Sequence, residues 1–408
     1  MKRYQWMGIM LSLVLLLCSC GTDKTVEKKV GESTSAPSAT ATVTPPISED
    51  EAFSEAEKIV KTMTIEQKVG QMFLVDLLQL DASPSVDGTA YKATDSMKQA
   101  IIDYHLGGVY LTKENIKSQK QTKKLVQNLQ ASVVSGSALY VAVEEDGGGE
   151  NSISAKVEDL KDTGYVTPKE MGQNMTANQI YESGKTIAGE LTKIGINLNL
   201  APVADLASDQ NPSYAMRCLG SDADGVADLL DDFVSGMREG GLSVTLKTFP
   251  GIGNVSADVT ESIAENTDSL MTIRDTNFVP YASGIQAGAD CVMVSNAAYS
   301  KLTVKKVPAF MSQDIVTKLL REELGFDGIV MTSPLNDNVI ENNYTNEFAV
   351  VEAVKAGCDL IVLPGNFKEC YEALITAVNE GRIDEKVINT SVRRILQNKI
   401  QRGILVLE

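Results

Sequence analysis

Short apolar runs rich in β-branched residues alternate with longer amphipathic segments along most of the chain. The runs have the length and composition of buried strands, and apolar residues recur at three- and four-residue spacing in the segments between them, as in helices. The predicted strands are Val69–Val75, Gly108–Leu111, Leu139–Val143, Asn197–Pro202, Ser243–Phe249, Cys291–Ser295, Gly328–Thr332 and Asp359–Leu363. The predicted helices include Gln119–Val134, Gln179–Ile194, Gly225–Glu239, Ser312–Leu324, Glu347–Ala356, Glu369–Asn379 and a basic amphipathic helix over Asp384–Gly403.

Eight strands separated by helices predict an α/β fold, a single-domain (β/α)8 barrel of the TIM type. An open, doubly wound sheet is the main alternative. The number of units over this length favours the barrel, and so does the absence of a Gly-x-Gly-x-x-Gly sequence after the first predicted strand. In such a barrel the functional residues belong to the loops at the carboxyl ends of the strands. The terminal helix is expected on the outside or the base of the barrel.

The amino terminus has the pattern of an exported lipoprotein. Lys2 and Arg3 precede an apolar run, Met7–Leu17, which has the length of a signal-peptide core and is short for a bilayer span. The sequence Leu-Cys-Ser-Cys-Gly that follows resembles a bacterial lipobox with Cys20 as its lipidated residue. The resemblance implies a signal peptide over residues 1–19 and an extracytoplasmic protein held on the bacterial cell membrane by several acyl chains. An uncleaved anchor helix is the alternative.

Residues 20–50 form a segment of different composition. They are rich in Ser, Thr, Ala, Pro and charged residues and contain almost no large apolar side chains. Such a segment buries too little surface to offset the entropy cost of ordering, so we expect a flexible, lipidated tether. The barrel domain is then expected over residues 51–408.

Charge and cysteine content narrow the possible partners. The formal net charge of −17 argues against nucleic acid and anionic lipid headgroups as partners, because both need a basic face. Neutral substrates or cationic surfaces fit better, and the oligomeric state stays open. Cys218, Cys291, Cys358 and Cys370 lack the close-paired spacing of a metal site. Cys291 and Cys358 adjoin strand-like runs and are expected to be buried thiols, although export permits disulfides.

His105 is the only histidine in the 408 residues, which excludes several kinds of catalytic site. A Ser-His-Asp triad or a Cys-His pair requires this one imidazole, and a site with several histidine ligands cannot form. His105 is interpreted as a histidine at a helix end near the start of a strand. No metal and no cofactor are expected.

The segment Lys247–Gly253 reads Lys-Thr-Phe-Pro-Gly-Ile-Gly and resembles a glycoside hydrolase signature with histidines at the positions of Thr248 and Ile252. Further matches follow along the chain in order. They are Met63–Gln71, Leu106–Val109, Gly195–Asp205, Leu319–Gly328 and Arg393–Leu396. The chain is therefore identified as a member of glycoside hydrolase family 3, similar to its single-domain β-N-acetylhexosaminidases. The resemblance covers nearly the whole barrel domain and implies that same barrel fold.

The resemblance also implies two catalytic positions, and this chain departs from the family at both. Family enzymes retain anomeric configuration with a carboxylate nucleophile and a second group that transfers a proton. In the hexosaminidases that group is a histidine paired with an aspartate, where this chain has Asp258 and Thr260. The family nucleophile in Ser/Thr-Asp-Asp-Leu is replaced, because Ser333 and Pro334 stand where both carboxylates belong. Neither Thr260 nor Ser333 supplies the required acid or charge.

Several sugar-contacting positions of the family are kept. Lys247 and Arg217 match its sugar-binding lysine and arginine, and Glu144 in Glu-Glu-Asp-Gly-Gly stands for the first residue of Asp-Gln-Glu-Gly-Gly. Thr248 belongs to the same predicted subsite. The alternative for Lys247 and Arg217 is a structural role, as buried charges paired with barrel acids such as Asp205. The chain departs from the family at two other positions. Gly149 replaces a second arginine, which directly follows Asp-Gln-Glu-Gly-Gly in the family, and Asn296 stands where a histidine is usual.

Two classes of function follow from these substitutions. The first is a surface-anchored, catalytically silent relative of the hexosaminidases that acts in glycan or partner binding, with a glycan or cell-wall component as the expected partner. The second is an active hydrolase of N-acetylhexosamine-containing glycans that recruits other carboxylates. Asp258 and Glu261, after the fifth strand, and Asp337, after the seventh, are the candidates for that role. Each of them also has an ordinary interpretation as a solvated loop acid.

Overall fold

The computed structural model describes residues 47–81, 83, 88–133, 137–148, 153, 166–255 and 258–407. The predicted signal peptide, Cys20 and nearly all of the predicted tether precede this part of the chain and lie outside the described residues, as does Gly149. Among the helices of the described residues, none is long and apolar enough to cross a lipid bilayer.

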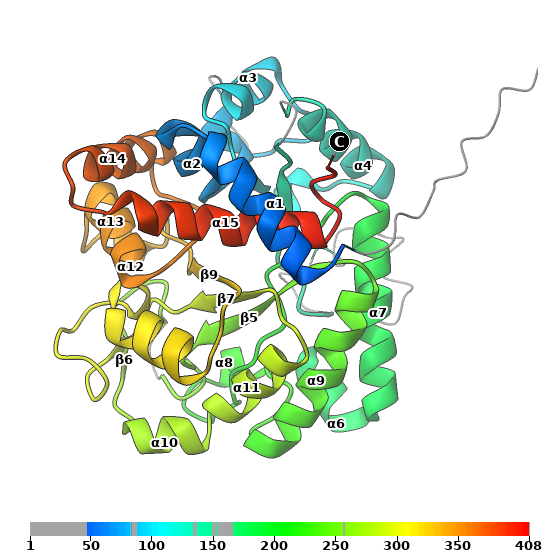
Figure 1. The fold of residues 1–408 in the computed structure, drawn as a ribbon. Helices are drawn as coiled ribbons and strands as arrows, with labels where there is room; N and C mark the ends of the chain where they lie inside the picture. Colours follow the sequence, from blue (N-terminus) through cyan, green and yellow to red (C-terminus); the bar gives the residue numbers. More distant parts are fainter. Residues whose placement is uncertain are drawn as a thin grey trace, which may run out of the picture. The chain divides into compact units, whose positions relative to one another are not determined.

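Eight parallel strands form the predicted barrel, which Figure 1 shows with its helices outside. The strands are β1 (Phe73–Asp76), β2 (Gly108–Tyr110), β3 (Tyr140–Val143), β4 (Leu198–Asn199), β5 (Ser243–Phe249), β7 (Cys291–Val294), β9 (Ile329–Thr332) and β10 (Ile361–Val362). Their order is β10-β1-β2-β3-β4-β5-β7-β9. A bridge between Met331 of β9 and Leu360, which precedes β10, joins the two ends of this order, so the barrel is nearly closed. This arrangement confirms the expected fold class and excludes the open sheet.

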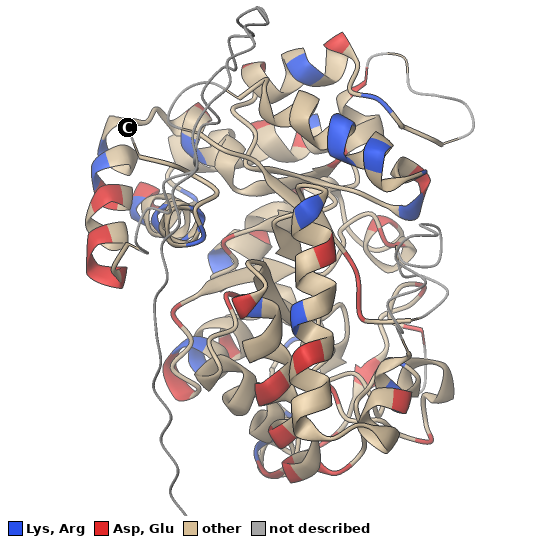
Figure 2. Cartoon of the chain, turned by 90° about the vertical axis from the view of Figure 1, so that its right-hand side faces the viewer, with Lys and Arg blue, Asp and Glu red and all other residues tan. Residues whose placement is uncertain are grey.

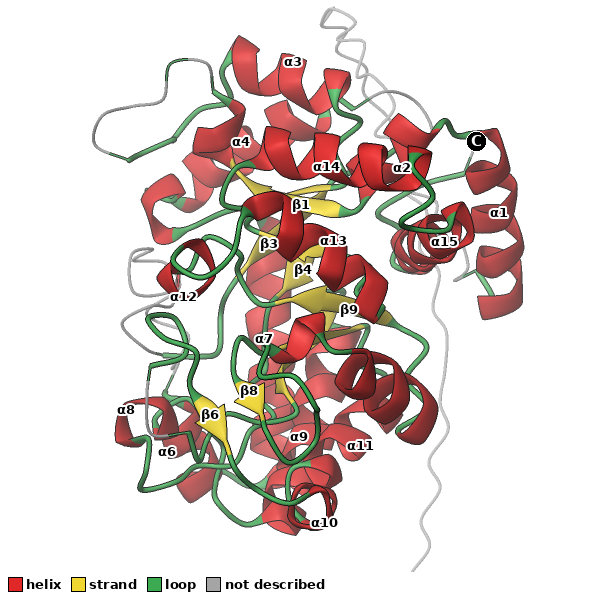
Figure 3. Cartoon of the chain, turned by 90° about the vertical axis from the view of Figure 1, so that its left-hand side faces the viewer, coloured by secondary structure: helices red, strands yellow, loops and turns green. Residues whose placement is uncertain are grey.

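Helices follow most strands and cover the barrel, as Figure 3 shows from another side. The α-helices are α1 (Glu49–Thr62), α2 (Ile65–Gln71), α3 (Asp95–Asp103), α4 (Gln119–Gln130), α6 (Pro168–Asn174), α7 (Ala177–Lys193), α8 (Pro212–Ala215), α9 (Ala223–Glu239), α10 (Leu270–Asp275), α11 (Phe278–Gln286), α12 (Asn338–Glu341), α13 (Asn346–Ala356), α14 (Phe367–Asn379) and α15 (Glu385–Gln401). The remaining helices are the 3₁₀ turns η1 (Leu77–Leu80), η2 (Lys113–Asn115) and η4 (Ala309–Met311) and the π-helix η5 (Asp314–Glu323). A separate pair of strands, β6 (Glu265–Asn266) and β8 (Ala298–Tyr299), is also parallel.

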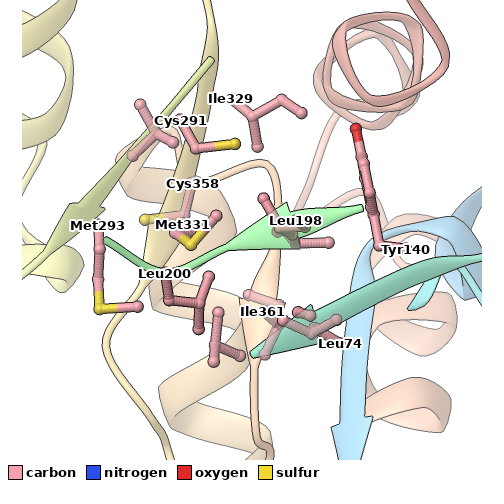
Figure 4. Close-up of a cluster of buried hydrophobic side chains, with 14 of the residues drawn as sticks. Leu74, Tyr140, Leu198, Leu200, Cys291, Met293, Ile329, Met331, Cys358 and Ile361 are labelled. Atoms are coloured by element: carbon pink, nitrogen blue, oxygen red, sulfur yellow. The ribbon is translucent and has the colours of Figure 1, made fainter. Parts of the chain in front are cut away.

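The barrel interior is filled by apolar side chains from successive strands. Met293 and Met331 project into it together with the thiols of Cys291 and Cys358, as Figure 4 shows. Parallel strands covered by helices are buried on both faces, which explains why their sequences are continuous apolar runs. The four cysteines of the described residues are all buried and free, which confirms the interpretation of Cys291 and Cys358 as buried thiols.

The prediction for the first strand was partly wrong. Val69 lies in helix α2, and the strand begins only at Phe73. Thr64 caps this helix by accepting a hydrogen bond from the Gln67 amide, and the Gln67 side chain accepts one from the Thr64 amide. This reciprocal cap starts a helix in a segment whose apolar residues alone suggested a strand.

The terminal helix α15 closes the amino end of the barrel, as predicted for the tail of the chain. Figure 1 shows α1 packed across it. The Asn398 side chain accepts a hydrogen bond from Tyr140 Oη at 2.7 Å and donates one to Asp290 at 2.8 Å. Lys399 from the same helix is fully buried. The opposite, carboxyl end of the barrel is therefore the open end, where the predicted site residues lie.

Candidate functional site

Two basic and two acidic side chains form a connected cluster at the carboxyl ends of β3, β4 and β5. Lys247 lies on β5, Arg217 follows α8, and Glu144 and Asp146 follow β3. Lys247 Nζ lies 2.6 Å from Glu144 Oε1 and 2.8 Å from Asp146 Oδ1. Arg217 Nε donates to Asp146 Oδ2 at 2.8 Å, and Arg217 Nη2 donates to Glu144 Oε1. Each cation therefore contacts both acids.

The cluster is closed on one side and open on the other. The Lys247 side chain is only 3% exposed and also donates to the Leu200 carbonyl. The Glu144 and Arg217 side chains are 36% and 33% exposed. Solvent, and hence a ligand, therefore reaches the cluster through Glu144 and Arg217, while Lys247 holds it from below.

Glu144 is held in its ionised form by this cluster. Partial burial alone raises the pKa of its carboxyl, but the charges of Lys247 and Arg217 outweigh that effect and place the pKa well below its usual range. Tyr110 Oη donates to the second Glu144 oxygen at 3.5 Å. At neutral pH Glu144 is an acceptor of hydrogen bonds and not a donor of protons.

Asp205 is the centre of a second set of hydrogen bonds, whose donors are uncharged hydroxyls and backbone amides. Within the described part of the chain, Asp205 accepts hydrogen bonds from the Thr248 amide at 3.2 Å, the Thr248 hydroxyl at 3.1 Å, the Ile252 amide at 3.1 Å, and the Tyr214 and Tyr281 hydroxyls, both at 2.9 Å. Complete burial raises the pKa of the Asp205 carboxyl, and these donors oppose the rise. The Thr248 hydroxyl is thus directed at Asp205, which fixes the backbone of the Lys-Thr-Phe-Pro-Gly segment.

The sequence offered Asp205 only as an example of a barrel acid that could pair with Lys247 and Arg217 in a structural role. Both cations do pair with acids, but among the described residues Asp205 is not one of them. Glu144 and Asp146 take that role because the turn after β3 places both acids beside the end of β5. Gly147 enables this turn with a backbone φ of 120°, a value that residues other than glycine rarely adopt. Asp146 was not predicted as a site residue, although it stands in the Glu-Glu-Asp-Gly-Gly sequence that drew attention to Glu144.

The loop after β5 is folded onto the loop after β9. Asp258 Oδ1 accepts hydrogen bonds from the Thr260 amide at 2.9 Å and from the Thr260 hydroxyl at 2.7 Å, so the two residues form a local turn. The Thr260 carbonyl accepts from the Val339 amide at 2.7 Å. The Asn338 side chain donates to both oxygens of Glu261, at 3.1 and 3.0 Å. These contacts bring Asp258, Thr260 and Glu261 next to the loop that carries Ser333 and Asp337.

Ser333 directly follows β9, and its hydroxyl side chain is neutral, so it places no charge at the end of this strand. Its amide donates to the Val294 carbonyl at 2.9 Å, its residue is 5% exposed, and Pro334 comes next. Asp337 is the carboxylate of this loop, and it accepts a hydrogen bond from Asn296 Nδ2 at 2.8 Å. Burial and the charges of Asp258 and Glu144 raise the pKa of Asp337 to about 7. This loop therefore contains a carboxyl that exchanges a proton near neutrality.

His105 lies at the end remote from these residues. It follows α3 and precedes β2, so it stands near the amino end of the barrel. Its carbonyl accepts a hydrogen bond from the Gln71 side chain at 2.7 Å, which agrees with the structural interpretation of this residue. In the part of the chain that is described, no group of three or more His, Cys, Asp or Glu side chains is arranged to hold a metal ion.

Comparison with known proteins gives a consistent result. The profile of the glycosyl hydrolase family 3 N-terminal domain matches residues 64–398. β-Hexosaminidase A of Pseudoalteromonas piscicida is 26% identical over 369 residues, which cover 83% of this chain and 61% of that protein. The β-hexosaminidase of Xylella fastidiosa (strain M23) is 29% identical over 266 residues, covering 64% of this chain and 77% of the relative.

Solved structures agree with these sequence matches. The family 3 β-N-acetylglucosaminidase of Paenibacillus sp. str. FPU-7 is similar with a TM-score of 0.75 and 29% identity, over 85% of this chain and 64% of that one. The β-N-acetylhexosaminidase of Beutenbergia cavernae DSM 12333 has a TM-score of 0.72 and 28% identity, over 83% of this chain and 98% of that one. The chain thus spans less than two thirds of the Pseudoalteromonas and Paenibacillus proteins.

Proposed function

The chain belongs to glycosyl hydrolase family 3, and from that premise we propose that it is a β-hexosaminidase-like protein that binds a glycan without cleaving it. The observation that carries this proposal is the end of β9, where Ser333 and Pro334 stand in place of the carboxylates expected of a family enzyme. A neutral hydroxyl without a base neither captures nor stabilises an oxocarbenium-like sugar.

The proton-transfer position supports the same conclusion. The Thr260 hydroxyl has a pKa far too high to exchange a proton near neutrality, and it donates to Asp258 Oδ1 at 2.7 Å. Asp258 is thereby engaged within its own turn. A retaining mechanism needs both a nucleophile and an acid/base, and this chain has substituted both.

Glycan binding is supported by the cluster around Lys247. Glu144 and Arg217 are about one third exposed and present an ionised acceptor beside a charged donor. Such a pair recognises neighbouring sugar hydroxyls by charge-assisted hydrogen bonds. Lys247 and Asp146 already hold Glu144 and Arg217 in place, so these two side chains lose little conformational entropy when a ligand binds.

The test uses a soluble form that begins at Ile47. Titration calorimetry with N-acetylglucosamine oligomers is expected to detect binding, and Arg217→Ala should weaken it by about tenfold or more. Hydrolysis of an aryl β-N-acetylglucosaminide should stay at the buffer rate while an active family member, run in parallel, is fast. An absence of binding to these oligomers, or turnover by the natural chain, would oppose the proposal.

A second candidate function is hydrolysis by recruited carboxylates, and Asp337 is the observation that favours it. Its pKa of about 7 suits a general acid, and Asp258 and Glu144 are close enough to raise that pKa. If this function operates, Asp337→Asn abolishes turnover and Asp258→Asn lowers it. Unchanged rates in both variants would remove this candidate.

Attachment to the cell membrane through Cys20 is also part of the proposal. It is supported by the lipobox-like sequence and by the apolar run before it. Replacing Cys20→Ala should leave an unlipidated precursor that lacks the mass of the acyl chains. Membrane fractionation and mass spectrometry of the natural protein and the variant test this. A variant that stays in the membrane fraction and still carries the mass of the acyl chains would refute it.

A further inference from the structure

A groove on the outside of the barrel collects lysines from two loops and one helix. Its volume is about 640 Å³, and it lies between the loop after β1, the loop after β2 and helix α4 as far as Asn128. Both loops leave the carboxyl end of the barrel, the end at which Arg217 and Lys247 lie. The lysines that line the groove are Lys92, Lys117, Lys120 and Lys124.

The groove carries charge of one sign in an acidic protein. No acidic side chain is among the described residues that line it, and all four lysines are exposed. None of them lies within ion-pair distance of a carboxylate of the described residues. Figure 2 shows the basic positions close together on α4. The net charge of −17 therefore does not describe this face, which attracts anions.

The groove is held in shape by hydrogen bonds of one partly buried side chain, Gln121. The Gln121 side chain donates to the Tyr91 carbonyl at 2.8 Å and to the Asn115 carbonyl at 3.0 Å. It also accepts a hydrogen bond from the Lys117 amide at 2.8 Å. Gln121 thus ties both loops to α4, so the lysines project from a fixed frame. A fixed frame lowers the ordering cost of binding.

The groove also offers a surface for a ring. Tyr91, Ala93 and Leu125 line it, and Lys117 Nζ lies 6.0 Å from the centroid of the Tyr91 ring. A partly exposed aromatic ring beside cationic groups suits a ligand that combines an apolar face with negative charge. A sugar that bears a carboxylate or phosphate has both features.

We propose that this lysine groove, defined by Lys92, Lys117, Lys120, Lys124 and Tyr91, binds an anionic glycan that carries carboxylate or phosphate groups. The choice of a glycan rests on the proposed function of the barrel mouth. Nucleic acid is the weaker alternative, because the described groove contains no arginine and a single aromatic ring. The groove would then select glycans by charge while the mouth binds neutral sugar hydroxyls.

The test compares binding of an oligogalacturonate, a poly(glycerol phosphate) and a neutral N-acetylglucosamine oligomer to the soluble protein. The triple variant Lys117→Gln, Lys120→Gln, Lys124→Gln should weaken binding of the acidic ligand by about tenfold or more. A matched triple variant, Lys58→Gln, Lys61→Gln, Lys318→Gln, removes the same charge from exposed positions elsewhere and should change binding less than about twofold. The two acidic probes distinguish carboxylate from phosphate as the preferred group.

Further variants separate this site from the barrel mouth. Tyr91→Ala should weaken the acidic glycan, whereas Arg217→Ala should weaken only the neutral oligomer. If the neutral oligomer fails to bind while the acidic one still depends on the groove lysines, the proposed function fails and the groove stands. Equal losses in the two triple variants, no acidic glycan binding, or tighter binding of a single-stranded DNA of equal charge would overturn the groove proposal.

Discussion

The side-chain amide of Asn296 donates a hydrogen bond to Asp337 at 2.8 Å and joins the loop after β7 to the loop after β9. Asn296 is almost fully buried, and its Oδ1 has no hydrogen-bond partner among the described residues. Asp337 meanwhile feels the charges of Asp258 and Glu144, and its pKa rises to about 7. Near neutral pH this carboxyl therefore holds a proton for about half of the time.

The first prediction is that Asp337→Asn stabilises the protein at alkaline pH. The folded state raises this pKa above the unfolded value of about 3.9, so the folded protein binds more protons between about pH 4 and pH 7. Stability from this group is present below pH 4 and is lost as pH rises through 7. Urea unfolding should show the variant gaining about 1–3 kcal/mol over the natural chain at pH 8.5.

The gain should disappear near pH 4, where both forms carry a neutral side chain at this position. Asp228→Asn, at an exposed position of α9, is the control and should give a difference that does not grow between pH 4 and pH 8.5. A difference for Asp337→Asn that is the same at both pH values would show that folding does not raise the pKa of this carboxyl.

The second prediction concerns Lys247, whose removal should destabilise the fold. Lys247→Met leaves Glu144 and Asp146 with Arg217 as their cation and exposes the Leu200 carbonyl to an apolar neighbour. Breaking a buried ion pair by removal of one partner costs about 3–5 kcal/mol. Urea unfolding at pH 7 measures the loss. Lys185→Met, which removes an exposed ion pair with Glu239, should cost less than about 1 kcal/mol.

Much of the fold could be predicted from apolar patterns, because parallel strands buried on both faces leave a strong signal. The predicted strand Ser243–Phe249 has the observed bounds, and predicted helices such as Glu369–Asn379 differ from the structure by a few residues. The error at Val69 arose because a reciprocal cap at Thr64 decided the local structure. That cap was readable in the sequence as a threonine followed three residues later by a glutamine.

The site was predicted less completely, because partner choice depends on how separate loops meet in space. Lys247 and Arg217 were singled out by the resemblance, yet their acids could not be identified from spacing along the chain. Asp146 lies 101 positions before Lys247, and it reaches the lysine through the turn after β3, in which Gly147 has a positive φ. The contact between Asn296 and Asp337 likewise joins two separate loops, and nothing in the spacing of these residues along the chain predicts that they meet.

The third prediction concerns Lys399, a buried lysine at the amino end of the barrel. Lys399 Nζ donates to Gln71 Oε1 at 2.9 Å and to the Gly107 carbonyl at 2.8 Å, and it lies 4.8 Å from the centroid of the Tyr140 ring. Burial lowers its pKa to about 7. The unfolded chain binds a proton there up to about pH 10.4, so stability rises between pH 7 and pH 10.

Lys399→Met should remove this rise. The stability of the variant relative to the natural chain should fall by about 1–3 kcal/mol between pH 7 and pH 10, because only the natural chain gains from deprotonation. Unfolding in urea at several pH values measures the difference. Lys58→Met, on the exposed face of α1, should show no such trend. A constant difference for Lys399→Met would mean that the buried amine keeps its proton.

The last prediction is that catalysis returns only when both missing groups are restored together. Thr260→His places an imidazole beside Asp258, and Ser333→Asp places a carboxylate at the end of β9. Each single variant should hydrolyse an aryl β-N-acetylglucosaminide at the background rate, since a glycosyl-enzyme intermediate requires both proton donation and covalent capture.

The double variant should exceed background yet remain far below an active family member. The contact between the Thr260 carbonyl and the Val339 amide uses backbone atoms and survives the substitution, so the new imidazole stays near the β9 loop. Pro334 restricts the backbone of residue 333, however, and a displacement of about 1 Å costs about 100-fold in rate. Thr260→His with Ser333→Asn keeps the shape without the charge and should show no activity. Activity in that control, or fast hydrolysis by the natural chain that Asp337→Asn abolishes, would establish recruited carboxylates as the catalytic groups instead.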